Sequence, residues 1–157
     1  DWWARELGRA LAPGTFGENL TIAGLLSAPL VIGDRLQIAA VTLEVTAPRI
    51  PCRTFATRMG DPGFVKRFRA AERPGLYCRV VREGRIAAGD AVTLLPYAGI
   101  SITIGEMFRA WYEADPDEAA IRRQLAAPIA TRARADQEAR LQNVLARRAA
   151  DSPASAE

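Results

Sequence analysis

The chain has 157 residues, about half of them apolar and a quarter charged, and its net charge is +3. The length allows one ordinary domain with a buried core, whereas the charge is too small for nonspecific binding to nucleic acid, which needs many phosphate contacts. No apolar run reaches the ~20 residues that would span a bilayer. The sequence contains no histidine, so these residues cannot by themselves build Ser-His-Asp triads, Cys-His dyads or most zinc sites.

The first part of the chain predicts one helix and then two strands. Apolar residues recur on one helical face over residues 2–11, and the stretch ends at "APG". A loop punctuated by glycines, "TFGENLTIAGL", follows it. Strands are expected at residues 35–39 and 41–46, because apolar side chains in the second of these alternate with polar or small ones.

Two prolines frame the segment "PRIPCRTF". Pro48 and Pro51 exclude a regular strand or helix at these positions and hold Cys52 on a stiff turn. Short helices are predicted in the next two stretches, "CRTFATRMG" and "DPGFVKRFRAAERPG". In the second, Asp61 is expected to cap the helix, with Pro62 at its first position.

The remaining chain changes from strands to helices. The stretch "GLYCRVVREGRIAAGDAVTLLP" predicts two strands joined at "EG", and Gly-Asp precedes an alternating strand both here and in "VIGDRLQI", which suggests two similar corners of a small barrel. Beyond Pro96 we expect a short strand-like start, a helix, a second helix capped by Asp115 and a longer third one. The predicted domains are therefore a β-rich unit at 1–97 and a helical unit at 98–157.

Cys52 has two readings that its surroundings leave open. A thiol close to Arg49 and Arg53 would have a lowered pKa, and its thiolate would suit a nucleophile, a redox sensor or a soft-metal ligand. Alternatively, it is a small buried hydrophobe, which is the common role of a lone cysteine. Cys78 lies in the middle of a predicted strand and is expected to serve packing.

Two further groups of residues can carry chemistry or can be purely structural. In "GENL", Glu18 offers a carboxylate and Asn19 both donates and accepts hydrogen bonds, although an asparagine here can equally close a loop or cap a helix. The basic side chains of "VKRFR", with Arg35, Arg49 and Arg53, form either a solvated face or a cradle for phosphate. No glycine-rich phosphate-binding motif occurs.

The motifs "FGENL", "IGDRLQI", "PRIPC", "GDP…KRF" and "GLYCRVVREGRIAAGD" occur in this order over residues 2–96. As a set they resemble the MOSC domain (molybdenum cofactor sulfurase C-terminal domain), and the helical tail resembles that of the small stand-alone bacterial members, which reduce 6-N-hydroxylaminopurine. The resemblance implies a mainly β fold with α, a MOSC-type β-barrel followed by a helical unit. The family's early strands have no counterpart here, so the barrel is expected to be incomplete at its N-terminus and the fragment inactive on its own.

The resemblance also implies a bound pyranopterin molybdenum cofactor, with Cys52 as the catalytic residue and metal ligand. Asn19 matches the family's asparagine near the cofactor, and Glu18 would face the substrate or a ring donor. The arginines implied at the cofactor, above all at its phosphate, are Arg35, Arg49, Arg53 and Arg67.

Three functions follow. The first is a cytoplasmic oxidoreductase that detoxifies small N-hydroxylated substrates and takes its electrons from a flavin-type partner reductase, with the oligomeric state, such as a homodimer, left open. The second is a cofactor carrier or sulfur-transfer module, since MOSC domains also occur fused to sulfurating enzymes. The third is a nonenzymatic β-barrel with a structural cysteine.

Overall fold

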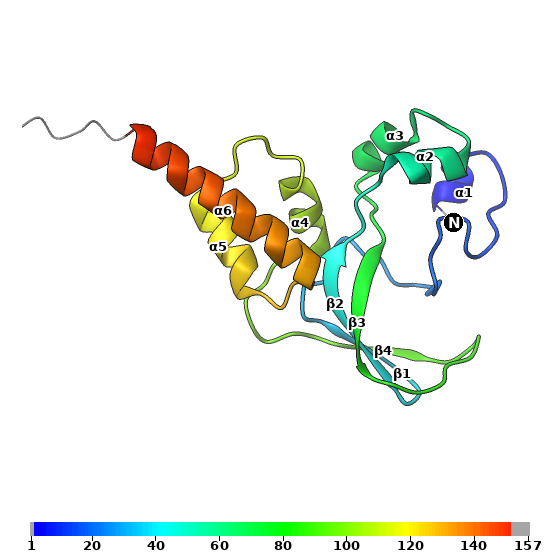
Figure 1. Cartoon of the computed structure of the whole chain (residues 1–157). Coiled ribbons are helices and arrows are strands. Elements are labelled where there is room, and N and C mark those ends of the chain that lie inside the picture. The colour runs from blue at the N-terminus through cyan, green and yellow to red at the C-terminus, as the bar shows by residue number, and fades with distance from the viewer. Residues whose placement is uncertain (1, 152–157) are drawn as a thin grey trace, which may run out of the picture. The chain divides into compact units, whose positions relative to one another are not determined.

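A computed structural model describes residues 2–151 of the chain. Its helices and strands are, in chain order, α1 (Trp2–Glu6), β1 (Arg35–Ile38), β2 (Val41–Pro48), α2 (Arg53–Met59), α3 (Phe64–Ala71), β3 (Leu76–Arg82), β4 (Val92–Leu95), α4 (Ile104–Ala110), α5 (Glu118–Ala126) and α6 (Thr131–Asp151) (Figure 1). No helix within this range is both long and apolar enough to cross a membrane.

The chain divides into two units. The aromatic unit takes the residues up to Leu25 together with Pro51–Ala71, and the sheet unit takes Leu26–Ile50 together with the chain from Glu72 onward. The predicted domain boundary at residue 97 was placed where strands give way to helices along the sequence. It differs from the division into these two units and stays a prediction.

Five aromatic rings form the core of the aromatic unit. Helix α1 supplies Trp3, the following loop Phe16, α2 Phe55, and α3 both Phe64 and Phe68. Trp3 stacks on Phe68 with the ring centroids 5.5 Å apart, while Phe55 meets both α3 rings edge to face at 5.2 Å. Such pairs contribute ~0.5–1.5 kcal/mol beyond the burial of their area, so a unit with only short helices has a well-defined core.

The ends of these helices differ from the predictions in two places. Helix α1 ends at Glu6 rather than near residue 11, because Gly8 takes a left-handed backbone with φ of 62°. Helix α3 begins at Phe64 rather than at Pro62, since the carboxylate of Asp61 accepts from the N–H of Gly63 at 2.8 Å in the turn before the helix.

The sheet unit is built on one antiparallel sheet of order β3-β2-β1-β4. The two expected strands are present as β1 and β2, and they pair antiparallel with each other. Strand β2 runs on to Pro48, two residues past its predicted end, so the prediction that Pro48 excludes a strand is wrong: as the last residue of β2 it still lies opposite Leu76. The two strands predicted on either side of "EG" are present as β3 and β4, but they do not pair with each other, because β3 pairs with β2 and β4 pairs with β1. They lie at opposite edges of the sheet, with the buried pair between them.

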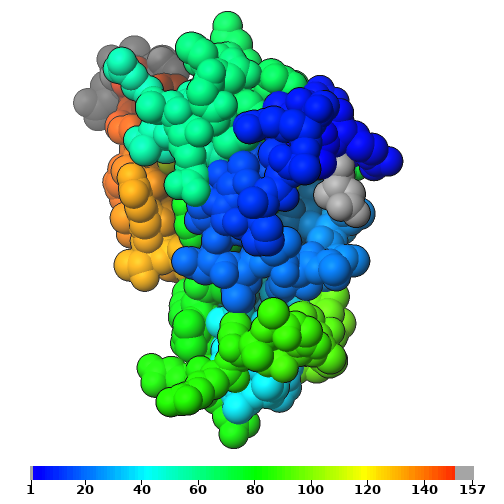
Figure 2. Space-filling model, turned by 90° about the vertical axis from the view of Figure 1, so that its right-hand side faces the viewer, coloured from blue at the N-terminus to red at the C-terminus, as the bar shows by residue number. Residues whose placement is uncertain are grey.

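The described residues do not close the sheet into a barrel. This agrees with the incomplete barrel that the resemblance implies. Strand β3 exposes Tyr77 and Val80 by 57% and 56%, and β4 exposes Leu94 and Leu95. Figure 2 shows the green segment that holds β3, β4 and their connection at the molecular surface, at the lower end of the view. Strands β3 and β4 are the two edge strands of this sheet, so each also has one side without a neighbouring strand among the described residues.

The two Gly-Asp corners are alike in structure as well as in sequence. Gly33 and Gly89 have φ of 99° and 94°, and each following aspartate accepts from a backbone N–H three residues upstream: Asp34 from Val31 and Asp90 from Ala87, both at 2.8 Å. Asp34 is buried and also accepts from the N–H of Tyr97 at 2.8 Å, so one carboxylate joins the segment before β1 to the segment after β4.

The helices of the sheet unit follow the sheet in the chain. Helix α4 packs on β2 and begins with a capping box of Thr103 and Glu106, and α5 lies beside α6 (Figure 1). Asp117, not the predicted Asp115, caps α5, because its carboxylate accepts from the N–H of Ala120.

Two arginines of α6 donate hydrogen bonds to the C-terminal ends of the two preceding helices. Arg134 donates to the carbonyl oxygens of Leu125 and Ala127 at the end of α5, and Arg140 donates to those of Ala110 and Trp111 at the end of α4. These contacts satisfy carbonyl groups that a helix leaves without an internal partner, so α6 bonds to both of its helical neighbours.

A side chain at position 33 in place of Gly33 should destabilise the folded protein. A Cβ built there would lie 2.6 Å from Cγ of the Tyr97 ring, and the backbone φ is unfavourable for any other residue. We expect Gly33→Ala to lower the free energy of unfolding by about 1–3 kcal/mol, measured in urea. Gly75→Ala is the matched control, since its Cβ would meet nothing closer than 3.8 Å. Equal stability of the two variants would contradict the prediction.

Candidate functional site

Cys52 occupies the N-cap position of α2. Its φ and ψ of −130° and 174° are extended, its side chain makes no capping hydrogen bond, and its carbonyl oxygen accepts from the N–H of Ala56 at 3.1 Å. The thiol is exposed, whereas the preceding Pro51 is buried. The predicted stiff turn is thus the short segment between the end of β2 at Pro48 and the start of α2 at Arg53, and the exposure of Cys52 contradicts its reading as a buried hydrophobe.

Glu18 and Asn19 lie in the loop between α1 and the sheet unit. Oε1 of Glu18 accepts from the N–H of Gly14 at 2.7 Å and from the hydroxyl of Thr21 at 3.2 Å, which folds the loop on itself. Its other oxygen, Oε2, is buried and accepts no hydrogen bond from the residues that the structure describes. Asn19 is exposed.

The charge of Glu18 follows from these bonds. Burial by itself would raise the pKa of this carboxyl, but hydrogen bonds from its own N–H, from that of Gly14 and from the Thr21 hydroxyl outweigh burial and lower the pKa below 4.5. The carboxylate is therefore ionised at neutral pH. Its contribution to stability is present above its ordinary pKa and is lost as the pH falls through the lowered value.

Arg58, which the sequence did not single out, holds the Glu18 loop on α2. Its Nε donates to the carbonyl oxygen of Thr15 at 2.9 Å, and its Nη2 donates to that of Gly14 at 2.7 Å. An arginine more than forty residues from its partners leaves no local signal. The aromatic unit consequently holds the "GENL" loop and the N-terminus of α2 as parts of one structure.

The two predicted arginines of the aromatic unit differ in their surroundings. Arg53 is the first residue of α2, directly after Cys52, and it is exposed. Arg67 lies on α3 and pairs with Asp61 at 3.3 Å and with Glu6 at 3.8 Å. Two carboxylates therefore neutralise the charge of Arg67, which makes it a weaker site for an anion than Arg53.

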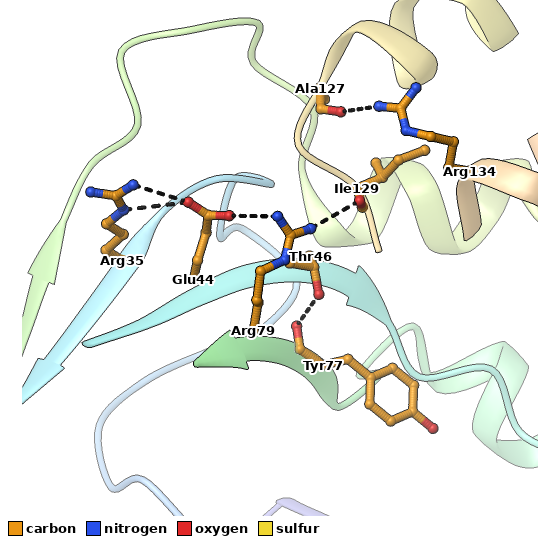
Figure 3. A network of polar contacts seen from close by, with 8 residues as sticks. All are labelled: Arg35, Glu44, Thr46, Tyr77, Arg79, Ala127, Ile129 and Arg134. Carbon is orange, nitrogen blue, oxygen red and sulfur yellow. Dashed lines mark hydrogen bonds and ion pairs between the residues drawn. The ribbon is translucent and has the colours of Figure 1, made fainter. Parts of the chain in front are cut away.

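Arg35 belongs to the sheet unit, where it pairs with a buried carboxylate. Glu44 lies directly opposite Arg35 of β1 on one side and Arg79 of β3 on the other, and its oxygens are 3.2 and 3.6 Å from the two guanidinium groups (Figure 3). Arg79 also donates to the carbonyl oxygen of Ile129 at 3.2 Å. Arg35 thus has a structural partner that a phosphate would have to compete with.

Arg49 also belongs to the sheet unit. Its N–H donates to the carbonyl oxygen of Gly75 at 2.8 Å, and its side chain is half-buried. The candidate residues therefore divide between the units. The aromatic unit holds Cys52, Glu18, Asn19, Arg53 and Arg67, and the sheet unit holds Arg35 and Arg49.

Within residues 2–151 no three or more Cys, Asp or Glu side chains gather in a way that could hold a metal ion. A metal bound at Cys52 would therefore receive most of its ligands from elsewhere. The described side chains therefore do not form a zinc-like site by themselves.

Cys78 differs from Cys52 in its environment. It lies on β3 opposite Val45 and is half-buried, and burial raises the pKa of its thiol to about 11. A thiol with this pKa is almost wholly protonated at pH 8, with about one thiolate in a thousand. The packing role that the sequence predicted agrees with this placement.

We expect thiol alkylation to separate the two cysteines. With iodoacetamide at pH 8, exposed Cys52 should be labelled much faster than Cys78, whose thiol is half-buried and almost wholly protonated. Peptide mass analysis over time measures both rates, and both sites should react alike in denaturant. Labelling of Cys78 as fast as that of Cys52 in the folded protein would contradict this assignment.

The solved structure of YiiM from Geobacillus stearothermophilus is similar to this chain, with a TM-score of 0.82 and 26% identity, over 89% of this chain and 72% of that one. This coverage includes part of the helices beyond residue 97, as the resemblance of the tail to stand-alone members implied. YiiM therefore shares both the strands and at least some of the helices of the present fold.

Two curated relatives match in sequence. The uncharacterized protein YflK of Bacillus subtilis is 36% identical over 64% of this chain and 47% of its own length, so the chain spans about half of that relative. A protein named reductase from Gibberella moniliformis is 36% identical over 57% of this chain and 16% of its own. The model of the MOSC domain matches residues 1–93. Since this match covers more than half of the sequence, the chain belongs to the MOSC domain family.

Proposed function

We propose that this chain binds a molybdenum cofactor through Cys52 and forms part of an enzyme that reduces N-hydroxylated compounds to amines. The observation that carries the proposal is the exposed thiol of Cys52, fixed between buried Pro51 and the first turn of α2, in a member of the MOSC family. The reductase among its relatives supports an enzymatic role.

The residues of the aromatic unit fit such a cofactor chemically. When bound, the group would supply a redox-active molybdenum with its own sulfur donors, and the Cys52 thiolate is a soft ligand suited to that metal. The buried Oε2 of Glu18 is an acceptor for an N–H of the pterin ring.

Among the arginines proposed for the cofactor phosphate we place Arg53 before Arg35 and Arg67, because Glu44 holds Arg35 and two carboxylates hold Arg67. Arg49 stays a candidate without a rank. A guanidinium already engaged by carboxylates gains less from a phosphate than one that is not. Asn19, exposed in the same loop as Glu18, is proposed as a further hydrogen-bonding residue for the cofactor.

The proposed reaction converts an N-hydroxyl group to an amine and water, and it consumes two electrons and two protons. We propose a flavin-type partner reductase as the electron source, with a small N-hydroxylated molecule as substrate. In this scheme the Cys52 thiolate would bind the metal. Because this thiol is exposed, a small substrate would have room to approach the metal.

A carrier or sulfur-transfer role is the second candidate, and the same exposed thiol favours it. A thiolate in reach of solvent can attack the outer sulfur of a donor persulfide, which leaves as a thiolate, and the persulfide formed on Cys52 can pass that sulfur on in the same way. Turnover of an N-hydroxylated purine with a reduced dye as electron donor separates the two. A carrier would bind molybdenum and pterin without reducing the substrate.

Replacement of Cys52 by serine should remove activity and spare the fold. The serine hydroxyl is harder and far less acidic than the thiol, so it is a poor ligand for a soft metal. We expect turnover of the whole protein to fall at least about 100-fold, with melting temperature unchanged and pterin largely retained through the arginines and Asn19. Turnover, molybdenum, pterin and thermal melting are measured on one preparation.

Cys78→Ser is the matched control, since the same atom is replaced at a half-buried position on β3. It should lower stability, because a hydroxyl replaces a thiol beside apolar neighbours, and it should keep molybdenum and turnover. Near wild-type turnover of Cys52→Ser with molybdenum present would refute the ligand assignment, as would loss of molybdenum from Cys78→Ser alone.

A further inference from the structure

Gly14 connects the carboxylate of Glu18 to the guanidinium of Arg58. Its N–H donates to Oε1 of Glu18 at 2.7 Å, and its carbonyl oxygen accepts from Nη2 of Arg58, also at 2.7 Å. The next carbonyl, that of Thr15, accepts from Nε of the same guanidinium at 2.9 Å. One planar side chain therefore holds two successive peptide groups of the loop that carries Glu18.

Helix α2 holds this guanidinium and the thiol near its two ends. Cys52 is the N-cap and Arg58 lies in the last turn, before Gly60 ends the helix with φ of 67°. Six residues of α-helix extend about 9 Å along the axis, and a helix this short does not bend. The Glu18 loop is thus fixed, through Arg58, to the same rigid element that presents Cys52.

A second anchor keeps the loop folded without Arg58. The ring of Phe16 packs against Phe55 with centroids 5.8 Å apart, and it also contacts Trp3 and Phe64. Loss of the guanidinium should therefore leave the aromatic core intact and change only how firmly residues 14–18 are held. Its hydrogen bonds are exposed to solvent, so the expected effect is moderate.

We infer that Arg58 is a positioning residue that fixes the Glu18 carboxylate relative to the Cys52 thiol. It touches no reacting group, and it acts by holding Gly14 and Thr15 on α2. The consequence for the cofactor rests on the proposed function, in which Cys52 and Glu18 contact the same molecule. The positioning itself does not depend on that function and can be tested separately.

The test compares Arg58→Met, Arg58→Lys and the control Arg9→Met, which removes the same charge from an exposed position of the same unit. Amide hydrogen exchange of residues 14–18, measured without cofactor, should be about fivefold faster in Arg58→Met, partly restored in Arg58→Lys and unchanged in Arg9→Met. In the whole protein with bound molybdenum, Arg58→Met should broaden the Mo(V) electron paramagnetic resonance spectrum and release pterin several-fold faster.

Unchanged exchange of residues 14–18 in Arg58→Met would overturn the inference, and so would equal acceleration in Arg9→Met. If circular dichroism shows that Arg58→Met does not fold, the exchange rates of residues 14–18 in Arg58→Lys test the inference instead. Lysine keeps the positive charge but cannot donate to the carbonyl oxygens of Gly14 and Thr15 with one planar group. If the wild-type protein binds no molybdenum, the proposed function fails, while the exchange rates still decide the role of Arg58.

Discussion

The buried carboxylate of Glu44 is the interaction on which the sheet unit depends. It lies in the central strand β2, directly opposite an arginine on each neighbouring strand. A buried carboxylate without a partner is unfavourable, so the half-exposed Arg35 and Arg79 keep β1 and β3 in register around it. Arg79 extends the same network by donating to the carbonyl oxygen of Ile129 (Figure 3). The next residue, Ala130, donates its N–H to the carbonyl oxygen of Thr46. These two bonds connect the sheet to the start of α6.

This structural use of arginine bears on function. Although almost all basic residues of the chain are arginine, several of them serve the fold: Arg35 and Arg79 balance Glu44, and Arg134 and Arg140 bond to helix carbonyl groups. A basic surface is therefore not the main feature of this protein. For the proposed cofactor the arginine of most interest is Arg53, which is exposed and directly follows Cys52.

Most elements could be predicted from the sequence, because alternation in β1 and β2 and the helical spacing in α2 and α3 are local signals. The positions of β3 and β4 could not, since their partners are β2 and β1 rather than each other, and pairing between distant strands leaves no mark on either one. The choice of Asp117 over Asp115 as the cap of α5 depended on which carboxylate reaches the N–H of Ala120.

The candidate site likewise combines features that the local sequence predicts with contacts between distant segments that it does not. The place of Cys52 after a fixed proline was readable from "PRIPC", and the partner of Arg35 was available in principle, because a hairpin turning at residues 39–40 sets residue 35 opposite residue 44. The contact of Arg58 with Gly14 and Thr15 was not readable, since it joins segments far apart in the chain through backbone carbonyl groups, which every residue has.

The central claim is that the thiolate of Cys52 binds molybdenum, and X-ray absorption at the molybdenum edge tests it most directly. The whole protein is purified from a host that makes the cofactor, and the wild type is compared with Cys52→Ser. The structure and the family together predict one sulfur neighbour fewer around molybdenum in the serine variant, with the remaining sulfur shell unchanged. An identical number of sulfur neighbours in the two proteins, at equal molybdenum content, would contradict the claim.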